Sequence, residues 1–345
     1  MMNIWDFIGR FYSPQDYSAL NAQRERWSMT HPFAGAKILD GTPIFRNTLV
    51  KYAVLLAGGA DLTISAGKNI PCAPNIVKLA PEFGIRVADD VILKEKFDAV
   101  ADCAGRHITV NSRCGYAELT RSGLEYYKHS PAPVFSVDSG ILKRFETTLG
   151  TGASFVRAMK HLGYTDFSGK KITVFGGGKV GRGSAYYSAL AGAEVLIADI
   201  NPVTLPPNVK FADANDTNTI EELIKSSWCI ISATGAANAL AKFLPALNGT
   251  NALIANMGVE DEWGMQIPPE RMLNNKQPLN FILPEPTLLR YIDPTMALHN
   301  QAAVELISSK YASGIQRIDN AVHDKYWQIV EAKGIIKEEL AEAGL

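Results

Sequence analysis

Hydrophobic and polar positions in residues 36–135 follow two alternating patterns. Short apolar runs predict an extended segment at Ile38–Leu39 and strands at Asp61–Ser65 and Phe97–Ala101. Between and after them, apolar residues recur at helical spacing over 47–58, 74–83 and 116–128. Strands that alternate with helices are typical of a parallel α/β sheet. The polar and aromatic residues 1–35 predict helices with a turn at Ser13-Pro14.

A second block of the same kind runs from Lys171 to about Leu283. Its expected strands are 172–175, 195–198, 210–211, 228–233, 252–256 and 280–283. Residues 294–309 and 318–333 then show helical periodicity without a strand partner nearby, so we expect them to bury their apolar stripes against the first block. The pattern therefore predicts a second α/β domain (148–290) inserted into a first one (1–147 and 291–345).

A glycine-rich turn follows the first strand of the second block. Residues from Lys171 read KITVFGGGKVGRG, and Gly176, Gly178 and Gly181 have the spacing of a dinucleotide-binding turn. The first glycine allows the tight turn, the second lets backbone approach a pyrophosphate, and the third lets the helix pack on the strand. The helix N-terminus then favours the negative charge. The sequence thus predicts a Rossmann domain.

Asp199 ends the next strand, about 20 residues after the glycines, where a ribose-binding acid is expected. Its carboxylate is suited to accept hydrogen bonds from two ribose hydroxyls and to repel a 2′-phosphate, and no arginine follows it closely. NAD is therefore favoured over NADP.

Composition narrows the class of partner. The 345 residues are 47% hydrophobic and 20% charged, with a net charge of −1. No Lys/Arg run is long enough for a polyanion-binding face, so we expect a small-molecule substrate rather than nucleic acid or a membrane. The N-terminus lacks a signal-peptide pattern, which favours a cytoplasmic protein. Neither the four cysteines nor the six histidines have metal-site spacing, so we expect no metal and no disulfide.

Several stretches resemble the S-adenosylhomocysteine hydrolases in order and wording. They are FETTLGTGASFVRAMKHLGYTDFSGKKITVFGGGKVGRG, EVLIADINP, IISATGAANAL and ALIANMG. Weaker matches are AGGADLTISAGKNI, with the family's Asn-Ile pair at Asn69-Ile70, AELTRSGLEYYK and HNQAAVELI. The resemblance implies the α/β fold, the inserted domain and tightly bound NAD. In that family NAD oxidises the substrate's 3′-hydroxyl, which permits thiol elimination, and is restored at the end.

The resemblance also implies a set of cofactor-binding residues. Besides the three glycines and Asp199, these are Lys179, Val180, Thr234, Gly235, Asn256, Gly258, Asn280, Thr120 and Ser122. For Thr234, Asn256 and Asn280 the alternative is that each side chain only satisfies backbone groups at a strand end.

The family's substrate residues are mostly replaced. Leu142 stands at the catalytic lysine position, while Val259, Asp293 and the neighbourhood of Pro43 take the histidine positions. Leu119 replaces a glutamate, one place after Glu118. The C-terminal extension that donates a lysine and a tyrosine to a neighbour's cofactor is also expected to be missing.

Four residues are left as catalytic candidates: Lys143, Glu146, Asp102 and His299. They are expected near an interdomain cleft, as an oxyanion-stabilising donor and a proton relay. The alternatives are a solvated Lys143 and a packed core histidine at 299. His107 is interpreted as a loop histidine.

Three further residues lie in the return crossing: Glu285, Arg290 and Asp293. They are candidates for binding a polar substrate or for an interdomain salt bridge.

Three functions remain open. The first is an NAD-dependent oxidoreductase acting on a hydroxylated or amino-bearing small molecule, such as a nucleoside or amino-acid derivative. The second is a divergent adenosylhomocysteinase-like hydrolase or lyase that uses NAD in an oxidise, eliminate, reduce cycle. The third is a non-catalytic NAD-binding regulatory protein. The resemblance further implies a homo-oligomer, either a dimer or a tetramer.

Overall fold

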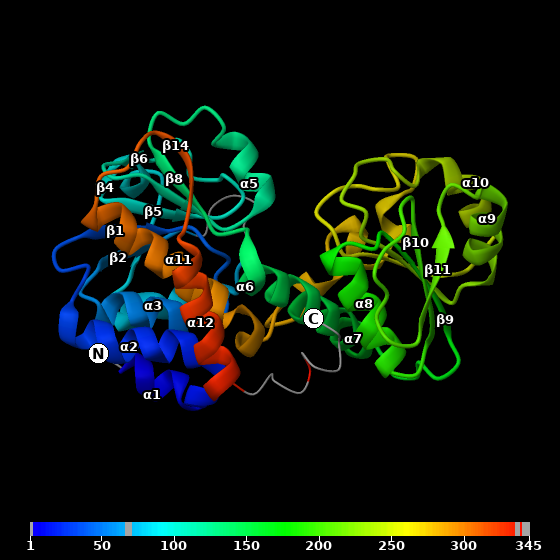
Figure 1. The fold of residues 1–345 in the computed structure, drawn as a ribbon, viewed down its shortest axis with the longest axis horizontal. Helices are drawn as coiled ribbons and strands as arrows, with labels where there is room; N and C mark the ends of the chain where they lie inside the picture. The colour runs from blue at the N-terminus through cyan, green and yellow to red at the C-terminus, as the bar shows by residue number, and fades with distance from the viewer. Residues whose placement is uncertain (1–2, 66–70, 335–338, 340–345) are drawn as a thin grey trace. The chain divides into compact units, whose positions relative to one another are not determined.

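The computed structural model describes residues 3–65, 71–334 and 339. The expected Asn69-Ile70 pair lies outside these residues. The chain divides into two compact units (Figure 1): unit 1 is 1–143 with 289–337, and unit 2 is 144–288 with 338–345. Within the described parts of the chain, no helix combines the length and the apolar character that a membrane crossing requires.

Unit 1 is built on a seven-stranded sheet with the order β14-β8-β7-β5-β1-β2-β3, and all of its neighbouring strands are parallel. Its strands are β1 (Lys37–Asp40), β2 (Asp61–Ile64), β3 (Arg86–Val87), β5 (Ala99–Asp102), β7 (Tyr116–Glu118), β8 (Pro133–Ser136) and β14 (Gly314–Arg317). A separate pair joins β4 (Lys96–Phe97) and β6 (Asn111–Ser112). The chain order reverses between β1 and β5, and ligands of doubly wound sheets bind at such a switch point.

Helices surround this sheet. They are α1 (Ile4–Ile8), η1 (Pro14–Tyr17), α2 (Ser18–Thr30), α3 (Thr48–Ala57), α4 (Pro74–Leu79), η2 (Ala80–Phe83), η3 (Ile92–Lys94), α5 (Arg121–Tyr126), α6 (Gly140–Phe145), α11 (Leu289–Ser308) and α12 (Asn320–Lys333). α11 contacts β5, β7, α2 and α3, so the returning C-terminal segment packs on the first block, as the periodicity predicts.

Unit 2 is a Rossmann domain with the parallel strand order β11-β10-β9-β12-β13. Its strands are β9 (Lys171–Phe175), β10 (Glu194–Asp199), β11 (Val209–Asp213), β12 (Cys229–Ser232) and β13 (Leu253–Asn256). Its helices and turns are η4 (Glu146–Gly150), α7 (Thr151–His161), α8 (Lys179–Leu190), α9 (Thr217–Ser226), η5 (Ala241–Phe243), α10 (Leu244–Asn248), η6 (Pro269–Arg271), η7 (Leu273–Lys276) and η8 (Leu279–Ile282). Side chains alternate along β9, so Val174 joins one apolar cluster and Phe175 the other.

Three sequence predictions about elements are wrong. The helix expected over 116–128 begins only at Arg121, because Tyr116–Glu118 form the strand β7 between β5 and β8. The C-terminal segment contains a strand, β14, whose partner β8 is distant in sequence and invisible to local periodicity. Residues 280–282 belong to the 3-10 turn η8 instead of a strand, and Leu283 is its C-cap; the turn follows Pro278, which has no N–H to donate to a ladder.

Candidate functional site

The glycine turn of unit 2 has the geometry that its spacing predicts. Gly176 has φ +95°, and a Cβ on it would lie 2.4 Å from the Ala233 carbonyl oxygen. A Cβ on Gly181 would lie 1.8 Å from the Gly176 carbonyl oxygen. A Cβ on Gly178, by contrast, would meet nothing within 4 Å. The first and third glycines are therefore required by packing, whereas the second borders open space at the start of α8, where the motif predicts a diphosphate.

Asp199 is tied to the same turn. Its Oδ2 accepts a hydrogen bond of 2.6 Å from the Gly177 N–H, and its Oδ1 accepts one of 2.9 Å from the Asn201 N–H. The carboxylate is half-buried at the end of β10 and keeps acceptor capacity beyond these two bonds. Asp199 therefore lies in contact with the glycine turn, and its contact with a ribose stays a prediction.

Lys179 and Val180 open α8 but differ in their surroundings. The Lys179 side chain is exposed, and the half-buried Val180 packs on the apolar cluster that contains Val174. Of these two side chains, that of Lys179 is therefore the one that faces solvent.

The strand ends beside the glycine turn carry the remaining unit 2 candidates. Thr234 and Gly235 form an exposed turn after β12. Asn256 donates through Nδ2 to the carbonyl oxygens of Glu260 (3.1 Å) and Lys276 (2.8 Å) and accepts from the Gly258 N–H at 3.1 Å. The Asn256 side-chain amide therefore satisfies backbone groups at the strand end, which is the alternative to cofactor contact given for this residue. Asn280 is 7% exposed in η8. Contact of these residues with NAD stays a prediction.

Thr120 and Ser122 also form local contacts. Thr120 is the N-cap of α5, where its Oγ1 accepts from the Gly123 N–H at 3.0 Å and donates to Glu118 Oε1 at 2.6 Å. The Ser122 hydroxyl donates to Thr120 Oγ1 at 3.4 Å. These contacts organise the turn after β7, and cofactor contact by the two residues is a prediction.

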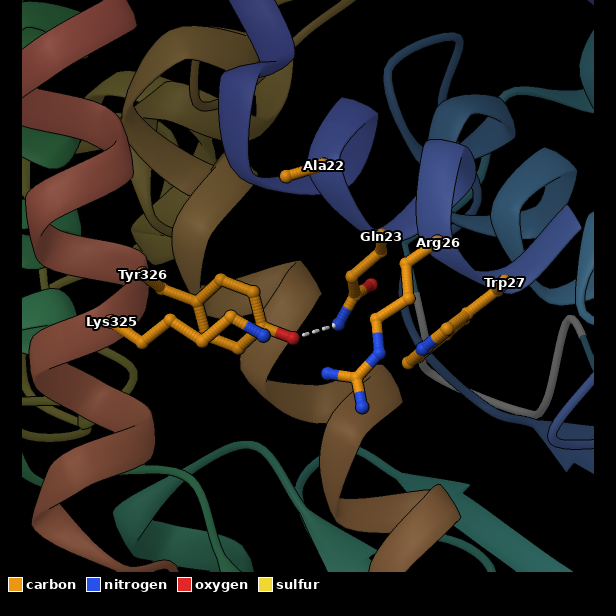
Figure 2. A pocket seen from close by; sticks show the side chains of 6 residues that line it. All are labelled: Ala22, Gln23, Arg26, Trp27, Lys325 and Tyr326. Atoms are coloured by element: carbon orange, nitrogen blue, oxygen red, sulfur yellow. Dashed lines mark hydrogen bonds between the residues drawn. The ribbon is translucent and has the colours of Figure 1, made fainter. Parts of the chain in front are cut away.

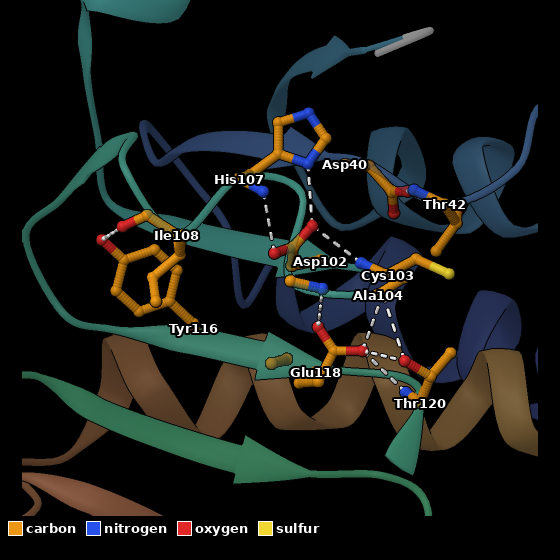
Figure 3. A network of polar contacts seen from close by, with 12 residues as sticks. Asp40, Thr42, Asp102, Cys103, Ala104, His107, Ile108, Tyr116, Glu118 and Thr120 are labelled. Atoms are coloured by element: carbon orange, nitrogen blue, oxygen red, sulfur yellow. Dashed lines mark hydrogen bonds and ion pairs between the residues drawn. The ribbon is translucent and has the colours of Figure 1, made fainter. Parts of the chain in front are cut away.

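In unit 1, Asp102 lies at the centre of a buried polar network at the end of β5 (Figure 3). Its Oδ1 accepts from the Cys103 N–H and contacts His107 Nδ1, both at 2.8 Å. Its Oδ2 accepts from the His107 N–H at 2.9 Å and from the Tyr127 hydroxyl at 2.6 Å. A carboxylate whose two oxygens already have four such partners is not free to meet a ligand itself.

His107 was missed as a functional candidate. A carboxylate accepts hydrogen bonds, so Nδ1 is the donor to Asp102, and Nε2 lies on the far side of the ring. His107 does lie in a loop, but it is 2% exposed rather than solvated. Ala104 and Gly105 have positive φ values of 60° and 64°, which turns the loop back onto Asp102. In the sequence, the small residues Ala104 and Gly105 between Asp102 and His107 could have indicated a tight turn that brings the two side chains together.

Glu118 lies beside this network and is also fully buried. Its carboxylate accepts from the N–H groups of Ala104, Gly105 and Thr120, at 2.9, 3.1 and 2.7 Å. Burial raises the pKa of Glu118, and the nearby charge of Asp102 raises it further. Glu118, rather than Leu119, thus supplies the acid of this turn.

A second buried pair lies at the end of the neighbouring strand β1. The Lys51 ammonium contacts the Asp40 carboxylate, and neither side chain is exposed. Asp40 Oδ1 also accepts from the Thr42 N–H at 3.0 Å. Because Asp40 and Asp102 end the two strands at the switch point, two buried acidic groups of unit 1 lie where doubly wound sheets bind ligands.

Three of the four catalytic candidates, Lys143, Glu146 and His299, are buried in the structure. Lys143 and Glu146 are 8% and 9% exposed, so the solvated alternative for Lys143 is wrong. His299 is fully buried and donates through Nε2 to the Ala117 carbonyl oxygen at 2.8 Å. Burial lowers its pKa far below the usual range, and the charges of Lys51 and Lys143 lower it further. These surroundings match the alternative of a packed core histidine at 299, and a part for it in a proton relay stays a prediction.

Asp293 also differs from expectation. It is 1% exposed and accepts from the N–H groups of Ala19 and Leu20 at 2.8 and 2.9 Å. The residue therefore satisfies the N-terminus of α2, and within the described residues its carboxylate is bonded to backbone rather than to a cationic side chain. Its neighbour in the same prediction, Arg290, donates to the Tyr291 hydroxyl at 2.9 Å. Glu285 is 5% exposed, and its carbonyl oxygen accepts from Arg157 at 3.1 Å.

A small hollow lies between α2 and α12 (Figure 2). Gln23 spans it, donating through Nε2 to the Tyr326 hydroxyl and the Ala297 carbonyl oxygen, both at 2.6 Å. Its lining residues are Ala22, Gln23, Arg26, Trp27, Lys325 and Tyr326. None of the predicted site residues is among them.

Comparison with known proteins identifies relatives of the chain. Residues 147–277 match the family described as S-adenosyl-L-homocysteine hydrolase, NAD binding domain. The chain is 25% identical over 279 residues to S-inosyl-L-homocysteine hydrolase of Methanocaldococcus jannaschii, covering 72% of this chain and 66% of that protein. It is 25% identical over 267 residues to adenosylhomocysteinase of Sulfurisphaera tokodaii, covering 70% and 64%. The matched region thus spans a little under two thirds of these relatives' length.

Two solved structures resemble the chain at a lower sequence identity. A transhydrogenase from Sinorhizobium meliloti superimposes with a TM-score of 0.47 at 14% identity, covering 81% of this chain and 99% of that one. A dipicolinate synthase chain from Bacillus halodurans has the same score and identity, covering 80% and 99%.

Proposed function

We propose that this chain, a distant member of the S-adenosylhomocysteine hydrolase family, binds NAD and uses it in a redox-neutral cleavage of a ribonucleoside thioether. The substrate class follows the names of the relatives, which are hydrolases of S-inosyl- or S-adenosylhomocysteine. The observation that carries the proposal is the glycine turn, in which Gly178 alone of the three motif glycines borders open space. That turn lies inside the stretch that matches the family's NAD-binding domain.

The residues of unit 2 fit the cofactor. The N–H groups at the start of α8 would hold the diphosphate, and Asp199 would accept from the ribose hydroxyls with the lone pairs that Gly177 and Asn201 leave available. When bound, NAD supplies a reversible oxidation of a substrate hydroxyl group. An acid at position 199 also favours NAD over its 2′-phosphorylated form.

The substrate-side chemistry is assigned to unit 1. The family's lysine position is occupied by Leu142, which is fully buried, and one of its histidine positions by Val259. Neither side chain can move a proton. The Asp102–His107 pair replaces them: Asp102 fixes the ring and its tautomer, and His107 Nε2 accepts the proton of a substrate hydroxyl.

The same substitutions favour a second candidate, a net oxidoreductase. The first oxidation needs only an acceptor for the hydroxyl proton, whereas thiol departure and the final reduction each need a proton donor. This chain lacks the family's lysine and histidine side chains at the positions from which such protons would come. A protein of this kind would release its oxidised product and accumulate reduced cofactor.

One experiment separates these functions. NAD-loaded protein is incubated with S-adenosylhomocysteine or S-inosylhomocysteine while free thiol and the absorbance of reduced nicotinamide are followed. Thiol release without accumulated NADH supports the redox-neutral cycle, and accumulated NADH supports the oxidoreductase. If NAD stays bound and neither signal appears, both enzyme functions are wrong and a binding protein is favoured.

A further inference from the structure

The segment that follows β13 returns to the turn that follows β12. Two backbone hydrogen bonds join them, from the Asn238 N–H to the Asp261 carbonyl oxygen at 2.9 Å and from the Leu240 N–H to the Glu262 carbonyl oxygen at 2.8 Å. They bring the side chain of Glu262, which is 1% exposed, under the turn formed by Thr234 and Gly235. Glu262 accepts from the Thr234 N–H through Oε2 at 2.9 Å and from the Gly235 N–H through Oε1 at 2.8 Å.

The turn held by Glu262 is in contact with the glycine turn. A Cβ on Gly176 would lie 2.4 Å from the Ala233 carbonyl oxygen and 2.8 Å from the Thr234 nitrogen, so the two backbones touch. The glycine turn is also fixed on its other side, where Asp199 accepts from Gly177. Displacement of Thr234 would therefore be transmitted to the first glycine of the dinucleotide motif.

A carboxylate is costly at this place unless it has a specific task. Burial raises the pKa of Glu262, and the neighbouring Glu260 raises it further, while the N–H groups of Thr234 and Gly235 lower it. Gly235 has φ +72°, and this conformation aims two successive N–H groups at one acceptor, as backbone anion-binding nests do. Both carboxylate oxygens are used, so a neutral amide at position 262 could accept from only one of the two groups.

We infer that Glu262 is a positioning residue for the dinucleotide site, holding the Thr234–Gly235 turn against the glycine turn from the side opposite the ligand. The inference rests on the proposed binding of NAD. In this inference Glu262 acts on the cofactor through Thr234 and Gly176 rather than by direct contact.

The test compares Glu262→Gln with Asp261→Asn, a matched control. Asp261 is the adjacent acid but pairs with Lys276 at 2.9 Å and does not face the turn. NAD affinity is measured by calorimetry, and amide exchange at Thr234 and Gly235 by NMR or mass spectrometry. We expect Glu262→Gln to weaken NAD binding about 10- to 100-fold, because one hydrogen bond to a charged acceptor is lost. Exchange at the two amides should rise, whereas Asp261→Asn should change neither quantity.

The outcomes are separable. If the wild-type protein binds no NAD, the proposed function fails and the inference fails with it. If the wild type binds NAD and Glu262→Gln binds equally well, only the inference is wrong. Should Glu262→Gln not fold, amide exchange in the unliganded wild type tests the inference. Thr234 and Gly235 are exposed residues, but their N–H groups are bonded to Glu262, so they should exchange more slowly than the Ala237 N–H; equal rates would overturn the inference.

Discussion

The imidazole ring of His107 lies directly over the α-carbon of Gly41, so that a Cβ at position 41 would be 2.3 Å from Nδ1. Gly41 follows β1 and His107 follows β5, the two strands between which the chain order reverses. The ring therefore reaches Asp102 only because residue 41 has no side chain.

Gly41→Ala should accordingly separate His107 from Asp102 without removing either group. We expect a stability loss of about 1–3 kcal/mol, as in other overpacked sites, and a strong loss of thioether cleavage. Nitrogen NMR of the imidazole should no longer show a single Nδ1–H tautomer. Gly249→Ala is the control, because its nearest contact would be 3.5 Å. An unchanged tautomer in Gly41→Ala would remove the orienting role of Asp102.

Two glycines of the cofactor turn should respond differently to alanine. Gly178 has φ −69° and borders open space, so Gly178→Ala should keep the unfolding midpoint of the protein. Its methyl group would enter the ligand's space and weaken NAD binding at least about tenfold. Gly181→Ala should instead lower stability by about 1–3 kcal/mol or more, because its Cβ would overlap the Gly176 carbonyl. Thermal unfolding and calorimetry on both variants test this, and equal responses would contradict the assignment.

Asp199→Arg tests cofactor choice. The variant loses the acceptor for the ribose hydroxyls and gains a partner for a 2′-phosphate, so NAD binding should weaken about 10- to 100-fold while NADP binding improves. Titration with both coenzymes measures the ratio. A preference that stays the same would exclude Asp199 as the residue that reads the ribose.

Asp293 should make stability depend on pH. Burial raises the pKa of Asp293 from 3.8 to about 7, although the N–H groups of Leu20 and Ala19 oppose the rise. Between these values the folded state holds a proton that the unfolded chain has released. The contribution of this group to stability is therefore greatest below about pH 4 and declines until about pH 7.

Asp293→Asn should abolish that decline in urea unfolding measured across this pH range. Asp89→Asn is the control, and it should change the pH dependence of stability in the opposite direction. Hydrogen bonding, chiefly from the Ile92 N–H, lowers the pKa of Asp89 instead of raising it. A slope that is the same in Asp293→Asn and the wild type would show that the carboxyl titrates normally.

Local pattern alone located most of the secondary structure and the cofactor turn. The glycine spacing, the preceding strand and Asp199 depend on residues close in sequence, so their geometry was predictable. The strands β7 and β14 were not predictable in this way, because each is stabilised by partners elsewhere in the sheet rather than by its own periodicity.

The roles of individual polar side chains were decided only by the tertiary structure. His299 and Asp293 are ordinary catalytic types in the sequence, yet packing buries both, and His299 Nε2 and the two Asp293 carboxylate oxygens bond to backbone groups. His107 and Glu262 carried no motif, yet the folded chain brings one to Asp102 and the other to the Thr234–Gly235 turn. The sequence by itself determined the Rossmann unit and its dinucleotide motif, since those signals are short-range. The tertiary structure alone determined which acids and histidines face one another, because burial and hydrogen-bond partners depend on residues far apart in the chain.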